Sequence, residues 1–331
     1  MIHDPTRIQS SARSAFLGSL VADAFSMPVH WYYNQQLIDS DYPDLIRSSG
    51  YLSPKNPHPD SILWRSQYSP PSQKFDILRE QSQYWGQRGI HYHQFLSAGE
   101  NTLNFRLAAI LFDQICRQRD YDPEAWLDRY ITFMLTPGQH NDTYLEEYHR
   151  HFFNNLAAHR KPINCGVRDI HIGGLVAVPA IVAALGPMHH DLKRVIRLHV
   201  SLTHKDDDVL AAADVLASIL VRTCQGDQLR EVILAEARDW ISTSKIENWS
   251  KYSDRHVVGN ILSPACYIKD AFPAALYLAW QHADDFQAGI TTNARCGGDS
   301  CHRGAVVGSL LGVSSHIPDE LLEHLALRDT V

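Results

Sequence analysis

The chain lacks the features of several broad protein classes. Its 331 residues contain no run of about 18 apolar residues, and the N-terminal segment MIHDPTRIQSSARS has no apolar core of a secretory signal. Lysine and arginine form no cluster, and the formal net charge is −7. These absences argue against a membrane protein and against a surface for nucleic acid or anionic lipid. We therefore expect a cytoplasmic protein whose partner is a small molecule or another protein.

Cysteine pairs are also missing. Six cysteines are scattered along the chain, and no two of them form a CxxC pair. Free thiols in a reducing compartment fit this pattern better than a disulfide framework. The remaining composition, with 44% hydrophobic and 20% charged residues, is ordinary for a soluble globular protein that buries a full core.

Strand signals are absent as well. The sequence shows no sustained period-two alternation, no hairpin signal and no alternation of strands with helices. Helical periodicity recurs instead, for example in Ser10–Met27, with Ser10 or Ser11 as N-cap, and in Tyr121–Pro137. We predict an all-α fold with one domain over residues 1–331. A proline-rich segment around residues 39–72 is predicted to be a long surface excursion, of a kind that often forms a functional lid.

The most informative stretch is NARCGGDSCHRGAVVGSLLG, residues 293–312. Its adjacent Gly297 and Gly298 permit backbone dihedrals that are closed to other residues, and they allow close approach to a ligand or another segment. Asp299 or Ser300 can cap the helix that follows. The pattern predicts a turn that presents a carboxylate.

Three glycines share one face of that predicted helix. Gly304, Gly308 and Gly312 recur every four residues. Each glycine inside a helix costs about 1 kcal/mol relative to alanine. A close contact with a second helix would offset this cost, so we predict tight helix packing directly behind the turn.

This stretch resembles the C-terminal signature of the ADP-ribosylglycohydrolase family, in which a glycine-glycine-aspartate turn precedes threonine, aspartate, threonine and a helix of small residues. Asp299 stands where the family has its first metal-binding aspartate, and Ser300 replaces a threonine. Cys301 falls on the second aspartate and His302 on the ligand threonine, while Asn293 fits the family's usual asparagine. The resemblance implies a metal site with altered ligands.

The N-terminal sequence FLGSLVADAFSMPVHW, Phe16–Trp31, is similar to the family's opening motif. Asp23, Ala24 and Pro28 match that motif. Trp31 and the two tyrosines after it form an aromatic cluster, which could stack on a base or a sugar or could only close the core.

A third landmark lies in residues 91–115, where a loop leads into a predicted helix. In the family this junction carries threonine-aspartate-aspartate-threonine, which supplies metal ligands. Here the corresponding residues are glycine, Glu100, Asn101 and Thr102. A carboxylate and a side-chain carbonyl can still offer oxygen to a metal. The alternative is a capped helix start with Glu100 in its first turn.

Polar residues are dense in GQHNDTYLEEYHRHFF, residues 138–153, which we predict to lie at the start of a helix. Asp142 and Glu146 have helical spacing. Asn141 and Asp142 could add a ligand or substrate contact, although a solvated, salt-bridged helix start explains the same residues. A further family-like segment, Ser201–Leu220, is predicted to be a helix that begins at Thr203 and His204, and His204 is predicted to be a buried structural residue.

The resemblance covers nearly the whole chain and implies an orthogonal helical bundle that brings residues 100–102 and 299–302 together at its centre. In the family, a binuclear magnesium or manganese site holds the ribose hydroxyls of an ADP-ribosyl group, and water cleaves the glycosidic bond. By resemblance, the expected metal ligands are Glu100, Asn101, Thr102, Asp299, Cys301 and His302. Either Glu100 or Asp299 could activate the water. The expected substrate contacts are Asp23, Trp31, Asn141, Asp142, Gly297 and Gly298.

The implied function is a metal-dependent hydrolase acting on an ADP-ribosyl group or a related ribosylated small molecule, with an ADP-ribosylated protein as a further partner. Magnesium prefers hard oxygen ligands, whereas thiolate and imidazole favour zinc or iron(II). If Cys301 and His302 both face the centre, the site should hold one transition metal in place of two magnesium ions. Two alternatives stay open. One is a non-hydrolytic binding or structural protein, as the resemblance of some lens crystallins to the family allows, and the other is a different reaction at the altered site.

Overall fold

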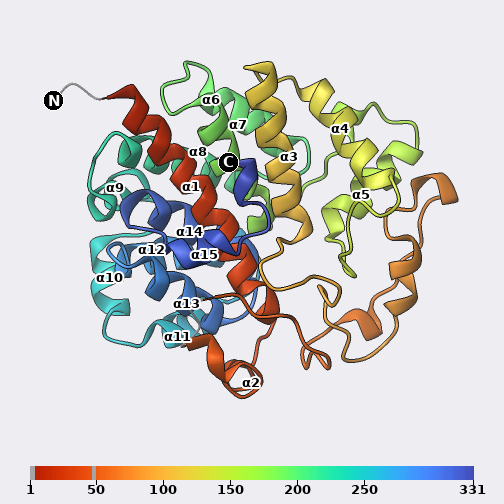
Figure 1. Ribbon diagram of the computed structural model, residues 1–331, viewed down its shortest axis with the longest axis horizontal. Helices are drawn as coiled ribbons and strands as arrows, with labels where there is room; N and C mark the ends of the chain where they lie inside the picture. The colour runs from red at the N-terminus through yellow and green to blue at the C-terminus, as the bar shows by residue number, and fades with distance from the viewer. Residues whose placement is uncertain (1–3, 47–49) are drawn as a thin grey trace.

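The computed structural model describes residues 4–46 and 50–331, and helices dominate it (Figure 1). Within these ranges there is no β-strand, only three isolated bridges. The prediction of an all-α fold is confirmed. None of the described helices has both the length and the apolar character that a membrane span requires. Residues 1–3 of the predicted domain and 47–49 of the predicted excursion lie outside the described residues.

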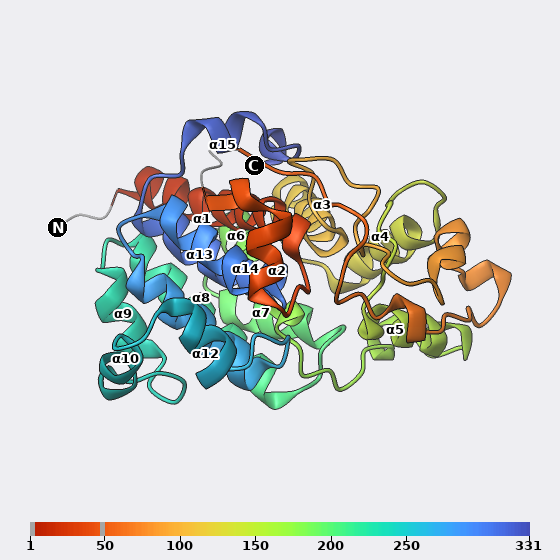
Figure 2. The same cartoon turned by 90° about the horizontal axis from the view of Figure 1, so that it is seen from below.

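The α-helices follow one another along the chain, with short 3-10 turns in several of the connections. Their bounds are α1 Pro5–Ser26, α2 Gln35–Asp41, α3 Leu103–Gln118, α4 Pro123–Leu135, α5 Glu147–Ala157, α6 Ala177–Leu185, α7 Leu192–Ser201, α8 Asp207–Cys224, α9 Leu229–Glu236, α10 Thr243–Trp249, α11 Asp254–His256, α12 Ile268–Gln281, α13 Phe286–Cys296, α14 Ser300–Ser314 and α15 Asp319–Glu323. Figure 2 shows α15 on the outside of the bundle, on the side opposite α10 and α12.

Helices α1 and α14 pack against each other at the centre of the bundle. A Cβ on Gly308 would collide with the carbonyl oxygen of Gly18, and a Cβ on Gly312 would collide with that of Ser14. Only glycine allows the two backbones to approach this closely. The predicted contact along the glycine face of α14 is therefore confirmed, and it anchors the turn that precedes α14.

Three predicted helix starts were wrong, and in α1 and α8 the reason is a capping side chain at another position. Helix α1 begins at Pro5, since the Asp4 carboxylate accepts the N–H of Thr6 at 3.0 Å and proline suits the first helical position. Helix α8 begins at Asp207, because Asp206 caps it and leaves Thr203 and His204 in the preceding turn. Helix α5 begins only at Glu147. Its predicted polar start around Asp142 is therefore a loop, in which Asp142 and Thr143 are buried and Asn141 is exposed.

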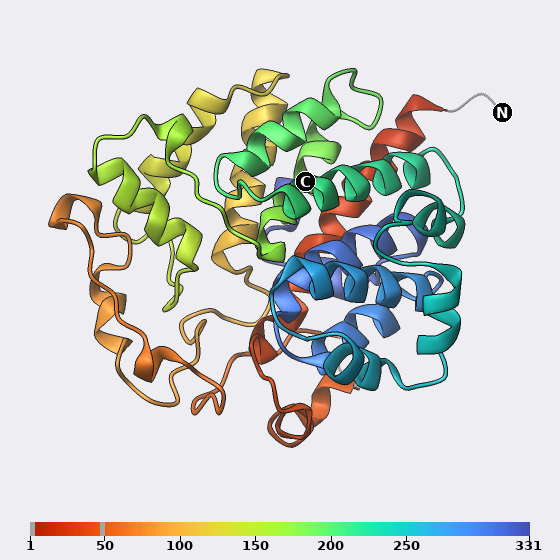
Figure 3. The same ribbon diagram turned by 180° about the vertical axis from the view of Figure 1, so that it is seen from behind.

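The proline-rich segment is mostly irregular. Its later part, residues 67–71, lies beside α5 on one side of the bundle (orange in Figures 1 and 3), whereas Tyr51 bonds to Leu321 of α15. Not all of it is on the surface. His58 and Leu63 are buried, and the neighbouring Ile62 and Arg65 line a cavity that the site section describes. The excursion thus contributes one wall of that cavity.

Candidate functional site

The turn before α14 has the conformation that its glycines allow. Gly297 and Gly298 have φ angles of 69° and 64°, in the left-handed region that favours glycine. The N–H of Gly298 donates to the carbonyl of Tyr32 at 2.6 Å, and the N–H of Trp31 donates to the carbonyl of Gly298 at 2.7 Å. Asp299 follows directly and caps α14, so the predicted capping role is confirmed.

A fully buried arginine braces this turn from inside. The Arg303 guanidinium donates to the Asn293 side-chain oxygen at 2.8 Å and to the Gly297 carbonyl at 2.8 Å. The Asn293 amide in turn donates to the Ser300 carbonyl at 2.8 Å. These hydrogen bonds hold the turn, and with it the carboxylate of Asp299, in one position.

Asp299 lies between two histidines, and we call the three residues His30, Asp299 and His302 the Asp299 cluster. Asp299 Oδ1 is 2.9 Å from His30 Nε2 and 2.8 Å from His302 Nδ1. All three side chains are buried, and one ligand atom from each lies within 4.8 Å of the others. Two imidazoles and one carboxylate at this spacing form a donor set suited to a transition metal.

Opposing effects set the charges of this cluster. Burial raises the pKa of Asp299, but the charge and hydrogen bonds of His302 and His30 outweigh burial and hold it well below its usual range. Burial lowers the pKa of His302, and the charges of Asp299 and Glu146 outweigh it and raise that pKa to about 9. Burial lowers the pKa of His30 to about 3. The cluster therefore contains an ion pair with a neutral imidazole beside it.

Two further buried residues extend the cluster inward, and we call His93 and Asp142 the Asp142 arm. His93 Nε2 lies 2.8 Å from His30 Nδ1, and His93 Nδ1 lies 2.5 Å from Asp142 Oδ1. Burial lowers the pKa of His93 to about 3 and raises that of Asp142 to about 7. Asp142, predicted to contact substrate, thus reaches Asp299 through two imidazoles.

On the opposite side, the cluster meets Glu146 and Asn104. Glu146 Oε1 is 3.4 Å from His302 Nε2, and burial raises the pKa of Glu146 to about 7. Asn104 Nδ2 lies 2.7 Å from His302 Nε2 and 3.2 Å from Glu146 Oε1. The amide of Asn104 can donate to His302 only when that imidazole is neutral, so it opposes the protonation that Asp299 favours.

Three of the other predicted metal ligands, Asn101, Thr102 and Cys301, form a separate group around Asp23, which we call the Asp23 cluster. The Asp23 carboxylate accepts hydrogen bonds from the Asn101 amide at 2.9 Å and from the Thr102 hydroxyl at 2.9 Å. Cys301 Sγ lies 3.7 Å from the backbone carbonyl of Asp23. Burial raises the pKa of Asp23 to about 6 although these hydrogen bonds lower it. The two sequence motifs therefore do meet, through Asp23.

Two predicted site residues lie apart from both clusters. The Glu100 carboxylate accepts the N–H of Ser97 at 2.6 Å and precedes α3, whose N-cap is Thr102. Asn141 is exposed, next to the buried Asp142. Roles for Glu100 and Asn141 stay predictions.

A cavity of about 380 Å³ opens onto Asp299 and His302. Aromatic side chains form much of its lining, and Glu146, Glu147, Arg65 and His171 add charge. Trp31 stacks on the His30 ring with centroids 3.9 Å apart. The complete lining is Trp31, Tyr33, Ile62, Arg65, Tyr92, Tyr144, Glu146, Glu147, Tyr148, His171, Gly173, Cys266, Tyr267, Asp299 and His302. The predicted Trp31 therefore both lines the cavity and packs in a small hydrophobic group with Leu63 and Tyr92.

One wall of the cavity carries a second histidine–carboxylate pair. His171 Nδ1 lies 2.8 Å from Asp169 Oδ1, and Asp169 is also 3.6 Å from the buried His204. Burial lowers the pKa of His171, but the hydrogen bonds with Asp169 and Cys266 outweigh it and raise the pKa to about 11. This wall therefore offers a positive charge to the cavity.

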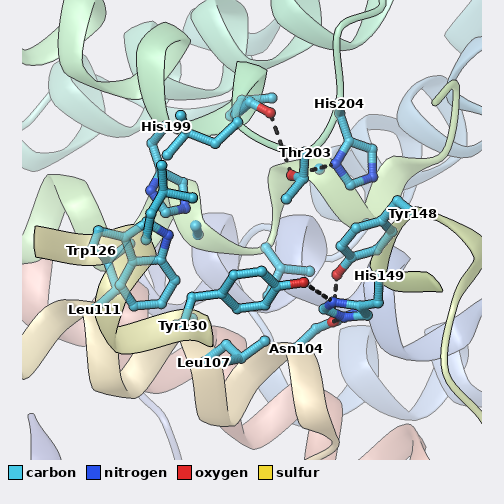
Figure 4. A pocket seen from close by; sticks show the side chains of 18 residues that line it. Asn104, Leu107, Leu111, Trp126, Tyr130, Tyr148, His149, His199, Thr203 and His204 are labelled. Carbon is cyan, nitrogen blue, oxygen red and sulfur yellow. Dashed lines mark hydrogen bonds between the residues drawn. The ribbon is translucent and has the colours of Figure 1, made fainter. Parts of the chain in front are cut away.

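A smaller cavity of about 60 Å³ adjoins the first, and Tyr148 and Gly173 line both; Asn104, which contacts His302, also lines the smaller one (Figure 4). Across it, the Tyr130 hydroxyl lies 2.7 Å from His149 Nδ1, and His149 Nε2 lies 2.9 Å from the Asn104 oxygen. The Asn104 side chain is thus held by His149 on the side of the smaller cavity and by His302 and Glu146 on the other side.

Sequence reasoning missed several residues of the site, namely His30, His93, Asn104, Glu146 as a cavity residue, His171, Cys266 and Arg303. The only signals for them were histidines near recognised motifs, such as His30 two residues after Pro28. As a whole, the arrangement offers a carboxyl group near neutral pKa, an imidazolium–carboxylate pair and aromatic surfaces around one cavity. Such groups can transfer protons and orient hydroxyls in a hydrolysis.

Two comparisons bear on this geometry. The sequence model described as ADP-ribosylglycohydrolase matches residues 4–331. A solved structure described as an "ADP-ribosylglycohydrolase-related protein complex" has a TM-score of 0.64 and 22% sequence identity over 98% of this chain and 95% of that chain. At this identity, the structural likeness shows a shared fold. No curated protein matches the chain.

Proposed function

The chain belongs to the ADP-ribosylglycohydrolase family, and from this we propose that it hydrolyses the glycosidic bond of an ADP-ribosyl group or of a related ribosylated small molecule. The reaction would take place in the 380 Å³ cavity. The observation that carries the proposal is that Glu146, Asp299 and His302 line this one cavity from adjoining positions. A small molecule, free or attached to a protein side chain, would be the substrate.

The size and lining of the cavity suit a ribosyl group with an attached ring or acceptor. Small-molecule sites typically have volumes of about 300–1,000 Å³ and aromatic walls with a few polar groups. Tyr144 and Tyr92 pack edge-on against Trp31, with centroids 5.1 Å and 4.7 Å from its ring. These rings offer flat surfaces for a sugar or base, while Arg65 and His171 offer positive charge to a phosphate.

Glu146 is the residue best placed to move a proton. A carboxyl group with a pKa of about 7 is half protonated near neutral pH, where general acid–base catalysis is most efficient. We assign Glu146 the role of general acid, which gives its proton to the leaving group. Asp299 keeps its negative charge and with His302 orients the ribose hydroxyls.

The metal site of the family fits this chain only in altered form. Asn101 and Thr102 use their side chains as donors to Asp23, and Glu100 accepts from Ser97, so these residues do not gather hard oxygens around Asp299. A pair of magnesium ions needs such oxygens. The donors that do converge are those of the Asp299 cluster.

We therefore propose one divalent transition metal, zinc, iron(II) or manganese, bound by the Asp299 cluster in place of two magnesium ions. Such an ion supplies Lewis-acid chemistry to a bound substrate oxygen. The residues of the Asp23 cluster would then hold the starts of α3 and α14 against α1, and Gly297 and Gly298 would hold Asp299 at the cavity. Buried Asn101 Oδ1 has no hydrogen-bond partner in the described part of the chain, and a direct ligand role for Asn101 can be tested by its substitution.

The test measures binding and turnover separately. ADP-ribose should raise the unfolding free energy by about 2.7 kcal/mol at a hundredfold excess over its dissociation constant, seen as a higher melting temperature. Peptides ADP-ribosylated on arginine or serine should release ADP-ribose, detected by mass spectrometry. Stabilisation without release from either peptide or from a ribosylated small molecule would favour the binding-only alternative. No thermal shift at millimolar ADP-ribose, with and without metal, would count against the ADP-ribosyl site.

A further inference from the structure

The Asp142 arm has no contact with the cavity, yet it joins the Asp299 cluster through an unbroken series of short hydrogen bonds. The links are 2.5 Å from Asp142 to His93, 2.8 Å from His93 to His30 and 2.9 Å from His30 to Asp299. All four residues are at most 3% exposed. Buried polar residues are costly unless their hydrogen bonds are satisfied, so a series of this length calls for an explanation beyond packing.

While both imidazoles are neutral, the hydrogen bonds of the series can all point in only one of two directions, either toward Asp299 or toward Asp142. A neutral imidazole has one N–H donor and one acceptor nitrogen. In the first direction Asp142 is protonated and every hydrogen points toward Asp299, to which His30 Nε2–H donates. In the second, His30 Nδ1–H donates to His93, and His93 Nδ1–H donates to an ionised Asp142.

The second direction leaves the lone pair of His30 Nε2 facing the carboxylate of Asp299 at 2.9 Å. Two acceptors at this distance repel one another unless a cation lies with them. A metal ion on the Asp299 cluster supplies that cation, and it requires a bare Nε2 on His30. The ionised carboxylate of Asp142 is the group that stabilises this direction, because it accepts the proton that His93 must present.

We propose that Asp142 and His93 are positioning residues that keep His30 in the tautomer with a free Nε2, and that they thereby set the metal affinity of the Asp299 cluster. This inference rests on the single-metal site of the proposed function. A carboxylate behind a metal-binding histidine is a general way to orient the ring and raise its basicity. Here the effect passes through a second imidazole, so the carboxylate acts from one residue further away.

The chain contains a matched control for this role. Asp169 is also a buried aspartate, and it pairs with His171 at 2.8 Å on another wall of the cavity. It makes no contact with the Asp299 cluster among the described hydrogen bonds and ion pairs. Asp169→Asn therefore makes the same chemical change at a similar depth without touching the arm.

The experiment titrates the full-length, metal-free protein with Co²⁺ and follows the visible absorbance of the bound ion. We expect Asp142→Asn and His93→Gln to raise the Co²⁺ dissociation constant roughly 10- to 100-fold, which is the range typical of residues that hold metal ligands in place. Asp169→Asn should stay within about twofold of the wild type. Glutamine in place of His93 can present either a donor or an acceptor to His30, so it uncouples His30 from Asp142.

Circular dichroism and melting temperature establish that each variant is folded, and His93→Gln decides alone if Asp142→Asn does not fold. Wild-type affinity in the folded arm variants overturns the inference, as does an equal loss in Asp169→Asn. Absence of a Co²⁺ signal in the wild type also overturns it. That result would not contradict the proposed hydrolysis, because the peptide assay measures release of ADP-ribose and does not depend on the cobalt signal.

Discussion

Cys301 and His302 are neighbours in sequence, but their side chains enter different clusters. His302 Nδ1 lies 2.8 Å from Asp299 Oδ1, whereas Cys301 Sγ lies 3.7 Å from the backbone carbonyl of Asp23. Burial raises the pKa of the Cys301 thiol well above its usual range, which disfavours the thiolate that binds metal. Of the two soft ligands expected from the sequence, the geometry supports only the histidine.

The first prediction follows from this difference. His302→Ala should lose bound transition metal, because it removes one of three donors, whereas Cys301→Ser should retain it. The measurement is elemental analysis of protein purified without added metal. Retention of metal by His302→Ala would remove that residue from the site, and loss in Cys301→Ser would restore the thiol as a ligand.

The second prediction concerns Asp299→Asn. The asparagine oxygen can still cap α14, so far-UV circular dichroism should be that of the wild type. Metal binding and hydrolysis should both be lost, because the Asp299 cluster loses its one carboxylate ligand. Release of ADP-ribose at the wild-type rate would exclude Asp299 from the mechanism.

The third prediction is a pH dependence set by Glu146. A general acid must be protonated to act, and burial raises the pKa of this carboxyl group to about 7. The value of kcat/KM should therefore be highest below pH 7 and fall tenfold per pH unit well above it. Glu146→Gln should lower kcat by roughly 10²–10⁴-fold and abolish this dependence.

The neighbouring Glu147 provides the control for that measurement. It lines the same cavity but is largely exposed, with 61% of its side-chain surface accessible. Glu147→Gln should keep the fall in rate above pH 7. If the rate instead rises through pH 7 in the wild type and not in Glu146→Gln, Glu146 acts as a base and its assigned role is wrong.

The fold could be predicted because its signals are local. Helical periodicity, missing strand patterns and the order of family-like segments needed no knowledge of distant contacts. The glycine face of α14 could also be predicted, since three glycines in one helix require a close neighbour. Errors arose at helix starts such as that of α1, where the capping side chain Asp4 lay outside the periodic segment.

The Asp299 cluster and its arm could be predicted only in part. Asp299 and Asp142 lie in recognisable motifs, but the histidines between them come from distant segments. His30 is 269 residues from Asp299 and 63 from His93, and Asp142 follows His93 by 49. No periodicity links such positions. The choice between Cys301 and His302 also depends on the direction of each side chain from one helical turn, which packing against α1 decides.

The last prediction tests the contact that holds the Asp299 turn. In a free helix, Gly308→Ala would stabilise α14 by about 1 kcal/mol, because alanine has the higher helix propensity. Here its Cβ would meet the Gly18 carbonyl and the Ala22 side chain of α1, so the two helices would have to separate. Overpacking typically costs about 1–3 kcal/mol, and we expect a lower free energy of unfolding in urea.

Gly173→Ala shows what the same change does where there is room. Gly173 is also buried, but an added Cβ would lie 3.8 Å from the nearest atoms, in ordinary contact with the His302 ring. Replacing a glycine by alanine without strain lowers the conformational entropy of the unfolded chain, and this stabilises a protein by about 0.4–1 kcal/mol. Opposite signs for the two variants are therefore expected. If Gly308→Ala proves as stable as Gly173→Ala, the approach of α14 to α1 is not what fixes the turn, and the position of Asp299 would depend on the hydrogen bonds of Arg303, Asn293 and the turn backbone.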